Sequence, residues 1–176
     1  MAFVPWFTIN PTTVLCLIGY FKKPDRSEKP SADFHKATVE AVIPTYNEEK
    51  NILLCLESLA NQTLTPQRIV LIDDNSSDRT VELAKSYAEE RGIDLKVMVH
   101  DRHCGKTPSV KYESRHCDAD VEFILDGDTI LDSPEYIERM VRELYNAEGA
   151  ASACGLVIPE TFSDRRHMLE SVKMKE

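Results

Sequence analysis

The sequence predicts an α/β fold in which a mainly parallel sheet carries helices on both of its faces. Two observations support this prediction. Short apolar runs typical of buried strands alternate along the chain with segments whose apolar residues recur every three to four positions. Alternation of this kind builds βαβ units, whose crossover helices make neighbouring strands parallel and cover the sheet on both sides.

The expected strands and helices begin after residue 38. The strands are short apolar runs at residues 39–43, 68–72, 95–99, 122–125 and 150–158. The first helix begins at Asn47 or Glu48, the second follows an N-cap at Ser77, and the third begins at Pro134. A last amphipathic segment runs from about residue 166 to the end. The buried face predicted for the first helix consists of Ile52, Leu53, Leu56 and Leu59.

Length, charge and cysteine content narrow the class of protein. The 176 residues suffice for one domain with its own core, and the net charge of −9 argues against a nucleic-acid partner. The five cysteines are scattered, which favours a reducing compartment, and Cys55 and Cys154 are expected to be small core residues. The His-Cys pairs at 103–104 and 116–117 match no standard zinc spacing.

The N-terminal segment, residues 1–21, contains no charged side chain and is followed by Lys22 and Lys23. A helix over residues 11–21 would be about 16 Å long, too short for a bilayer core of about 30 Å. We therefore expect an anchor at the membrane interface on the cytoplasmic face of the cell membrane, then a linker over residues 22–38. The alternative is an apolar arm packed on a cytoplasmic domain.

Polar and acidic residues follow three of the expected strands at the point where each strand ends. The sequence reads PTYNEE from residue 44, DDNSSD from residue 73 and DGDT from residue 126. An isolated Asp-Gly turn is a common explanation for any one of them. Because ligands of parallel sheets bind beyond the carboxyl ends of the strands, three such segments predict one shared site.

Two phosphate-binding motifs are excluded. The Gly-Lys-Thr at residues 105–107 ends like a P-loop, but that loop needs a glycine at position 100, where the chain has His100. The chain also contains no G-x-G-x-x-G, so a dinucleotide-binding fold is unsupported.

A phosphatase of the haloacid-dehalogenase type is a weaker alternative. In that class the first Asp of a DGDT segment is the nucleophile and the second is an acid or base. The nucleophile normally follows the first strand of the core, whereas three expected strands precede Asp126 here. Little chain follows Asp128 to supply the remaining phosphate and metal ligands, and PTYNEE and DDNSSD would have no role.

The segments VIPTYNEEKNILLCLESLANQT and IVLIDDNSSDRTVELA, a Gly-Lys loop and FILDGDTIL occur in an order and spacing that resemble the family-2 glycosyltransferases of GT-A fold. The resemblance covers roughly residues 39–160. It implies a Rossmann-like nucleotide-binding half and transfer of a sugar, with inversion, from a UDP- or GDP-sugar donor. The acceptor, a glycan or a lipid, is not specified by these motifs.

The resemblance also implies roles for individual residues at the phosphate end of the donor. Asp128 would bind Mg²⁺ or Mn²⁺ directly, and Asp126 would contact the ribose or the metal and its water. Lys106 would meet the diphosphate or the donor sugar. Two carboxylates beside a diphosphate suit these cations independently of the family, because both prefer oxygen ligands.

At the nucleoside end, Asp74 would accept a hydrogen bond from the base, with Asp73 beside it. The base would lie against a wall that includes a stacking tyrosine, and Glu48 would lie near the ribose. The residues of that wall are Pro44, Thr45 and Tyr46.

The chain departs from the family pattern in two places. GKTPSVKYE replaces a loop that usually reads GKAxALNxG, so Lys111 stands at the Asn position and Glu113 at the later Gly. No (E/T)-D motif that could supply a catalytic base follows residue 158. We therefore expect the donor-binding portion of a longer enzyme, in which residues 161–176 begin an acceptor-side helix. The alternative is a nucleotide-sugar-binding fragment without turnover.

Overall fold

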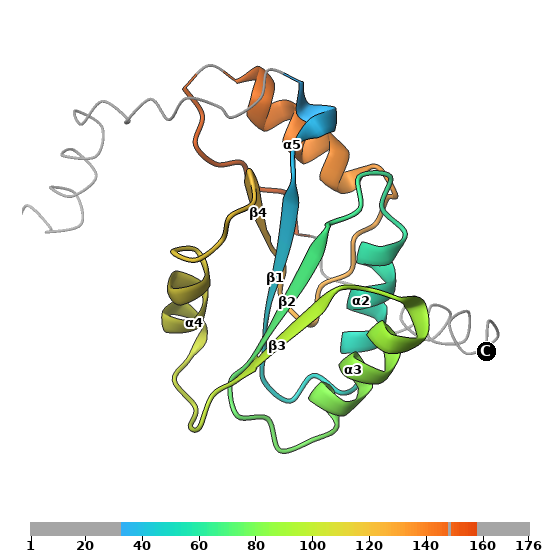
Figure 1. Ribbon diagram of the computed structural model, residues 1–176, viewed down its shortest axis with the longest axis vertical. Helices are drawn as coiled ribbons and strands as arrows, with labels where there is room; N and C mark the ends of the chain where they lie inside the picture. Colours follow the sequence, from blue (N-terminus) through green and yellow to red (C-terminus); the bar gives the residue numbers. More distant parts are fainter. Residues whose placement is uncertain (1–32, 148, 158–176) are drawn as a thin grey trace, which may run out of the picture.

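Four parallel strands form a single sheet in the computed structural model, which describes residues 33–147 and 149–157 (Figure 1). The order of the strands is β3-β2-β1-β4. Their bounds are Val39–Thr45 for β1, Arg68–Asp73 for β2, Leu95–Val99 for β3 and Val121–Ile124 for β4. Every pairing in the sheet is parallel, which confirms the prediction.

The register of the sheet aligns the carboxyl ends of three strands. Thr45 of β1 is opposite Asp73 of β2, and Asp73 is opposite Val99 of β3. The fourth strand stops earlier, with Ile124 opposite Val42. The chain that leaves β4 therefore passes alongside the end of β1 before it turns.

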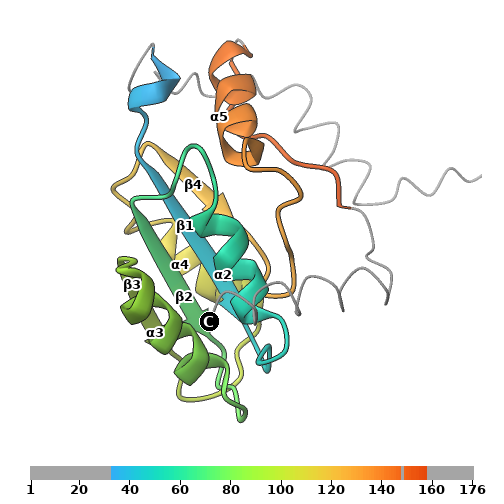
Figure 2. The same ribbon diagram turned by 90° about the vertical axis from the view of Figure 1, so that its right-hand side faces the viewer.

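Helices lie on both faces of the sheet, as predicted. Helices α2 and α3 cover one face, α4 lies on the other, and α5 lies beside the short 3-10 helix η1 (Figures 1 and 2). The bounds are Phe34–Lys36 for η1, Ile52–Ala60 for α2, Thr80–Arg91 for α3, Lys106–Glu113 for α4 and Tyr136–Asn146 for α5.

The core is divided by the sheet into a larger and a smaller part. On the α2 side, Ile43 and Leu71 of the strands pack with Ile52, Leu56 and Leu59, which confirms three of the four residues predicted for the buried face of the first helix. The fourth, Leu53, is only partly buried. The opposite face carries a smaller cluster of Val42, Val70 and Ile72 against Met98. Because neighbouring residues of β1 and β2 enter opposite layers, these strands are continuous apolar runs in the sequence.

Helix α2 begins at Ile52, later than the predicted start at Asn47 or Glu48. Asn47 has a left-handed backbone with φ of 56°, which a helix cannot include. The carbonyl oxygen of Glu48 then accepts hydrogen bonds from the backbone N–H groups of Asn51 and Ile52. A turn between β1 and α2 thus occupies the residues that the sequence assigns to the first helical turn.

The other two predicted helices also begin slightly later than expected. Helix α3 begins at Thr80 instead of directly after Ser77, because the Asp78 carboxylate accepts hydrogen bonds from the backbone N–H and hydroxyl of Thr80. Helix α5 begins at Tyr136, two residues after Pro134. Shifts of about two residues at a helix end leave the predicted elements unchanged.

Helix α4 is absent from the sequence prediction. Its sequence, KTPSVKYE, has no apolar stripe, and Pro108 lies within its first turn, where proline is tolerated. The helix is attached to the sheet by an ion pair of 2.8 Å between Glu113 Oε1 and Lys96 Nζ of β3. The side chain of Glu113 is 1% exposed and that of Lys96 is 46% exposed, so the carboxylate is buried while the ammonium group stays partly in solvent.

The predicted fifth strand is wrong over residues 150–157. That segment forms no strand in the structure, and Leu156 and Val157 are 81% and 77% exposed. Cys154 is exposed as well, so it is not a core residue, whereas Cys55 is fully buried as predicted. An apolar run becomes a strand only when a neighbouring strand pairs with it, and here no such pairing forms.

The end of the expected linker is part of the domain. Ala37 is buried, and the backbone N–H and hydroxyl of Thr38 both donate to the Asp120 carboxylate. The proposed anchor at residues 1–21 and the expected helix at residues 161–176 lie outside the described residues. Within the part that the structure describes, no helix has the length and apolar character needed to cross a bilayer.

Gln62 connects the end of α2 to the start of α5, and we expect its loss to destabilise the domain. Its amide donates to the carbonyls of Ser58 and Ser133 and accepts from the N–H of Ile137; the bond to Ser133 is partly buried and the other two are buried. Gln62→Ala removes these three hydrogen bonds and the partner of the buried Ile137 N–H, although the Ser133 carbonyl still accepts from the N–H of Tyr136. The change should lower the free energy of unfolding by about 1–3 kcal/mol.

Urea denaturation measures the effect of this change. Lys85→Ala, on the exposed face of α3, is the control and should change stability by less than about 0.5 kcal/mol. Equal stability of Gln62→Ala and the control would contradict the role assigned to Gln62.

Candidate functional site

The carboxyl edge of the sheet gathers every residue that the sequence assigned to a site. The loops after β1, β2 and β4 lie at this edge, as the parallel topology requires, and the loop between β3 and α4 joins them. The assigned residues are Pro44, Thr45, Tyr46, Glu48, Asp73, Asp74, Lys106, Asp126 and Asp128.

The loops that follow β1 and β2 are joined by hydrogen bonds between backbone and side chains. The N–H of Asn47 donates to Ser76 Oγ over 2.8 Å, and the N–H of Ser77 donates to Asn47 Oδ1 over 2.8 Å. The N–H of Glu48 donates to Thr80 Oγ1, also over 2.8 Å. Several polar residues of PTYNEE and DDNSSD are therefore structural, and they hold Tyr46 and Glu48 at the edge.

Gly127 allows the turn after β4 to approach β1. A β-carbon at this position would lie 2.7 Å from Thr45 Cγ2 and 3.3 Å from Glu48 Cγ, so only glycine fits without displacement. Thr45 is itself buried, and its hydroxyl reaches the carbonyl of Ile72. Asp126 and Asp128 therefore flank the glycine that packs closely against the side chains of Thr45 and Glu48.

Three carboxylates, those of Glu48, Asp126 and Asp128, form an acidic cluster above the buried thiol of Cys55. Burial raises the pKa of that thiol, and the charges of Asp128, Asp126 and Glu48 raise it further. The Cys55 thiol also contacts the carbonyl of Asp126. The three carboxylates give this edge of the sheet a negative electrostatic potential.

Lys106, at the first position of α4, forms an ion pair with Asp126. Both side chains are about half exposed, and Asp128 is exposed next to the hydroxyl of Thr129. In the part of the chain that the structure describes, the oxygens of the three carboxylates in the acidic cluster do not all lie close enough together to bind one ion by themselves. A cation here would take further ligands from water and from its substrate, as Mg²⁺ usually does.

A groove of about 890 Å³ opens beside the acidic cluster. Lys106, Asp126 and Asp128 line one end of it, and β4, α5 and residues 151–157 form its walls. Tyr46, Asp73 and Asp74 do not line this groove. The predicted site residues therefore fall into two groups.

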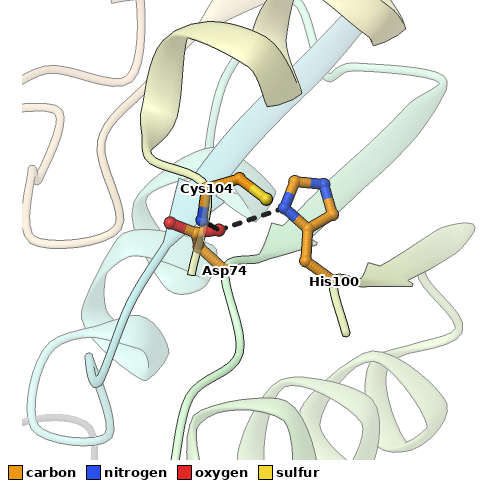
Figure 3. Close-up of side chains that lie close together, drawn as sticks. All are labelled: Asp74, His100 and Cys104. Carbon is orange, nitrogen blue, oxygen red and sulfur yellow. Dashed lines mark hydrogen bonds and ion pairs between the residues drawn. The ribbon is translucent and has the colours of Figure 1, made fainter. Parts of the chain in front are cut away.

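The second group centres on Asp74, whose carboxylate is buried at the end of β2. Its Oδ1 accepts from the N–H of Cys104 over 2.7 Å and lies 3.0 Å from His100 Nδ1 (Figure 3). Its Oδ2 accepts from the N–H of Gly105 over 2.7 Å and lies 2.8 Å from His103 Nδ1. The sequence predicted none of these partners.

These contacts keep Asp74 ionised. Burial by itself works to raise the pKa of the carboxyl, but the hydrogen bonds from Cys104, His100 and Gly105, together with the nearby His103, lower it below its usual range. A buried carboxylate needs such partners to remain charged.

Asp73 and Tyr46 border this second group. Asp73 Oδ2 accepts from the N–H of Ser76 over 2.9 Å, while its buried Oδ1 has no hydrogen-bond partner within the described ranges. The ring of Tyr46 is 48% exposed and lies 4.5 Å from the ring of His103, at an interplanar angle of 47°. Pro44 precedes them in β1.

His100, His103 and Cys104 are the residues that sequence reasoning missed. A signal was present, because these residues follow the third strand at its carboxyl end, where the same rule that selected the other three loops applies. The His-Cys pairs at 103–104 and 116–117 instead suggest zinc ligands when they are taken together, but their spacing matches no standard zinc site. In the fold, His116 contacts Tyr112 and does not reach this edge.

Comparison with known proteins identifies a family. The model described as Glycosyl transferase family 2 matches residues 40–175. The undecaprenyl-phosphate 4-deoxy-4-formamido-L-arabinose transferase of Serratia proteamaculans is 30% identical over 121 residues, which are 65% of this chain and 37% of that protein. The chain thus spans little more than a third of this relative's length.

Two solved structures share the fold. S. aureus TarS in complex with UDP-GlcNAc has a TM-score of 0.53 and 24% identity, over 61% of this chain and 32% of that one. The mannosyltransferase PcManGT from Pyrobaculum calidifontis, in complex with GDP-Man and Mn²⁺, has a TM-score of 0.55 and 21% identity, over 88% and 44%. These likenesses confirm the predicted GT-A architecture.

The contact between Gly127 and Thr45 leads to a prediction about packing at the acidic cluster. Gly127→Ala should lower the free energy of unfolding by about 1–3 kcal/mol, because the added methyl group meets Thr45 Cγ2. Thr45→Ser removes that methyl group and keeps the hydroxyl. The double variant should therefore lose less stability than the sum of the two single variants.

A double-mutant cycle in urea measures the coupling between the two positions. Strictly additive effects would show that the Thr45 methyl group is not what requires glycine at position 127.

Proposed function

Because the chain belongs to glycosyl transferase family 2, we propose that residues 39–160 bind the donor in a metal-dependent, inverting glycosyltransferase that uses a UDP- or GDP-sugar. The observation that carries this proposal is the acidic cluster beside Lys106 at the end of the groove. The family match also removes the support for a phosphatase, in which Asp126 would have been the nucleophile.

The residues of the acidic cluster suit a diphosphate leaving group. Asp128 and Asp126 would hold Mg²⁺ or Mn²⁺, which neutralises the negative charge that develops as the nucleoside diphosphate departs. Lys106 is next to Asp126, so its ammonium group is within reach of the same diphosphate. Glu48 packs against Gly127 and places a further carboxylate near the ribose.

The group around Asp74 is proposed to receive the nucleoside base. Tyr46 is exposed and would stack on the base in the place that His103 now occupies. Asp74 would accept a hydrogen bond from the base. Its carboxylate already has four partners, so the His103 side chain, which is 59% exposed, would have to move aside.

A lipid phosphate is the acceptor class that we propose. The relative from Serratia proteamaculans is named as a transferase acting with undecaprenyl phosphate. A phosphate oxygen is already an anion at neutral pH, whereas a sugar hydroxyl needs a base to remove its proton. Such an acceptor would place the enzyme at the cytoplasmic face of a membrane, where residues 1–21 are proposed to lie at the interface. The alternative is a donor-binding fragment without turnover.

Metal dependence of nucleotide binding tests the acidic cluster. We expect UDP or GDP to bind at least about tenfold more tightly with Mn²⁺ than without it, a difference of about 1.4 kcal/mol. Asp128→Asn should remove this metal-dependent part, because it deletes a charged oxygen ligand. Titration calorimetry with and without Mn²⁺ provides the measurement.

Asp118→Asn is the matched control, since it makes the same change of charge at an exposed position before β4. If Asp128→Asn retains the metal dependence of the wild type, the assignment of Asp128 as a metal ligand is wrong.

The acceptor class is tested by transfer of label from UDP- and GDP-sugars to a short-chain polyprenyl phosphate or to free oligosaccharides. We expect labelled product with the polyprenyl phosphate and little with sugar hydroxyls. Transfer to oligosaccharides alone would contradict the lipid-phosphate proposal. Metal-dependent donor binding with no transfer to either acceptor would support the binding fragment instead.

A further inference from the structure

We propose that Asp74, His100 and Cys104 form a second metal site, suited to Zn²⁺ and separate from the acidic cluster. A carboxylate oxygen, an imidazole nitrogen and a thiol sulfur from these residues lie within 4.8 Å of one another. The carboxylate comes from the end of β2, and the other two groups come from the loop that follows β3 (Figure 3). Within the described ranges, no other His, Cys, Asp or Glu side chains form such a group of three.

The separations between the three ligand atoms approach those found around a tetrahedrally coordinated Zn²⁺ ion. Zinc bonds are about 2.0–2.2 Å to oxygen and nitrogen and about 2.3 Å to sulfur, so ligand atoms around one ion lie about 3.3–3.6 Å apart. Asp74 Oδ1 and His100 Nδ1 are 3.0 Å apart. An ion could replace the hydrogen between them if they separated by a few tenths of an ångström and the sulfur, which lies within 4.8 Å of both, moved inward by at most about 1.5 Å.

The three ligand types distinguish this site from the acidic cluster. Thiolate and imidazole are ligands that Zn²⁺ accepts readily, whereas Mg²⁺ and Mn²⁺ favour sites built from oxygen. The acidic cluster offers only carboxylates among its three defining residues, Glu48, Asp126 and Asp128. One edge of the sheet would therefore bind two cations of different chemistry.

The surroundings of Asp74 already resemble the outer shell of a metal site. Its second oxygen, Oδ2, accepts from the N–H of Gly105 and contacts His103 Nδ1. Hydrogen bonds of this kind fix the orientation of a ligating carboxylate. His103 holds Oδ2 only while no nucleotide is bound; when it moves aside for the base, Oδ2 accepts from the base and Oδ1 stays with the ion. The fourth coordination position is left to water.

The metal would act as a clamp on the loop that carries Lys106. Cys104 lies two residues before Lys106, and Lys106 starts α4 and pairs with Asp126. An ion bound by Asp74, His100 and Cys104 would secure this loop to the end of β2. It would therefore hold the start of α4 beside the acidic cluster.

Cobalt spectroscopy of the whole chain, kept reduced and in excess Mg²⁺, tests the site. Co²⁺ substitutes for Zn²⁺ and reports a bound thiolate through a sulfur-to-cobalt charge-transfer band in the near ultraviolet. We expect this band with one equivalent of Co²⁺, intense visible absorption typical of tetrahedral coordination, and loss of both when Zn²⁺ is added.

The variants identify the ligands. Cys104→Ser should abolish the charge-transfer band, and His100→Gln should weaken Co²⁺ binding by at least about tenfold. Cys117→Ser and Cys154→Ser, at the other non-core cysteines that the structure describes, should leave the band unchanged. Asp128→Asn should also leave it unchanged, which separates this site from the metal site proposed at the acidic cluster.

Circular dichroism establishes that each variant is folded before it is titrated. Absence of the band in the wild-type protein, or its persistence in folded Cys104→Ser, would overturn the proposal.

Discussion

The parallel pairing of β1 with both β2 and β4 is the constraint on which the rest of the site depends. β1 is the strand that joins the β2–β3 half of the sheet to β4, and Val42 and Ile43 at its centre are fully buried. Its pairing with β2 brings Thr45 level with Asp73, and its pairing with β4 brings the Asp-Gly-Asp turn against Thr45. The two groups of site residues are therefore positioned by one strand, whose burial on both faces makes a shift in register costly.

The acidic cluster and the group around Asp74 stabilise their negative charges in different ways. The acidic cluster is partly open to solvent, and one of its carboxylates is balanced by Lys106. Asp74 is buried, and backbone N–H groups and imidazoles from a single loop surround its carboxylate. The first arrangement leaves charge available to a cation and a diphosphate. The buried carboxylate of Asp74 instead fixes the conformation of the loop before Lys106 through its hydrogen bonds.

Helix α4 shows how the chain compensates for its departure from the family pattern. Glu113 stands where the Gly-Lys loop of the family usually has a glycine, and its Oε1 pairs with Lys96 of β3. The other oxygen, Oε2, is buried and has no hydrogen-bond partner within the described residues. Burying this carboxylate carries a desolvation cost that offsets much of its attraction to the partly exposed Lys96, so the ion pair contributes position more than net stability. Its effect is to hold the far end of the helix that begins with Lys106.

The sequence by itself determined the alternating architecture, the parallel sheet and the edge at which the site lies. It could do so because strands buried on both faces must be continuously apolar, and parallel strands must end at one edge. Only the tertiary structure decided that residues 150–157 form no strand, that α4 exists, and that His100, His103 and Cys104 surround Asp74. It also placed Thr45 and Glu48 where a β-carbon at position 127 would meet them. These features depend on contacts between residues far apart in the chain, which local periodicity does not encode.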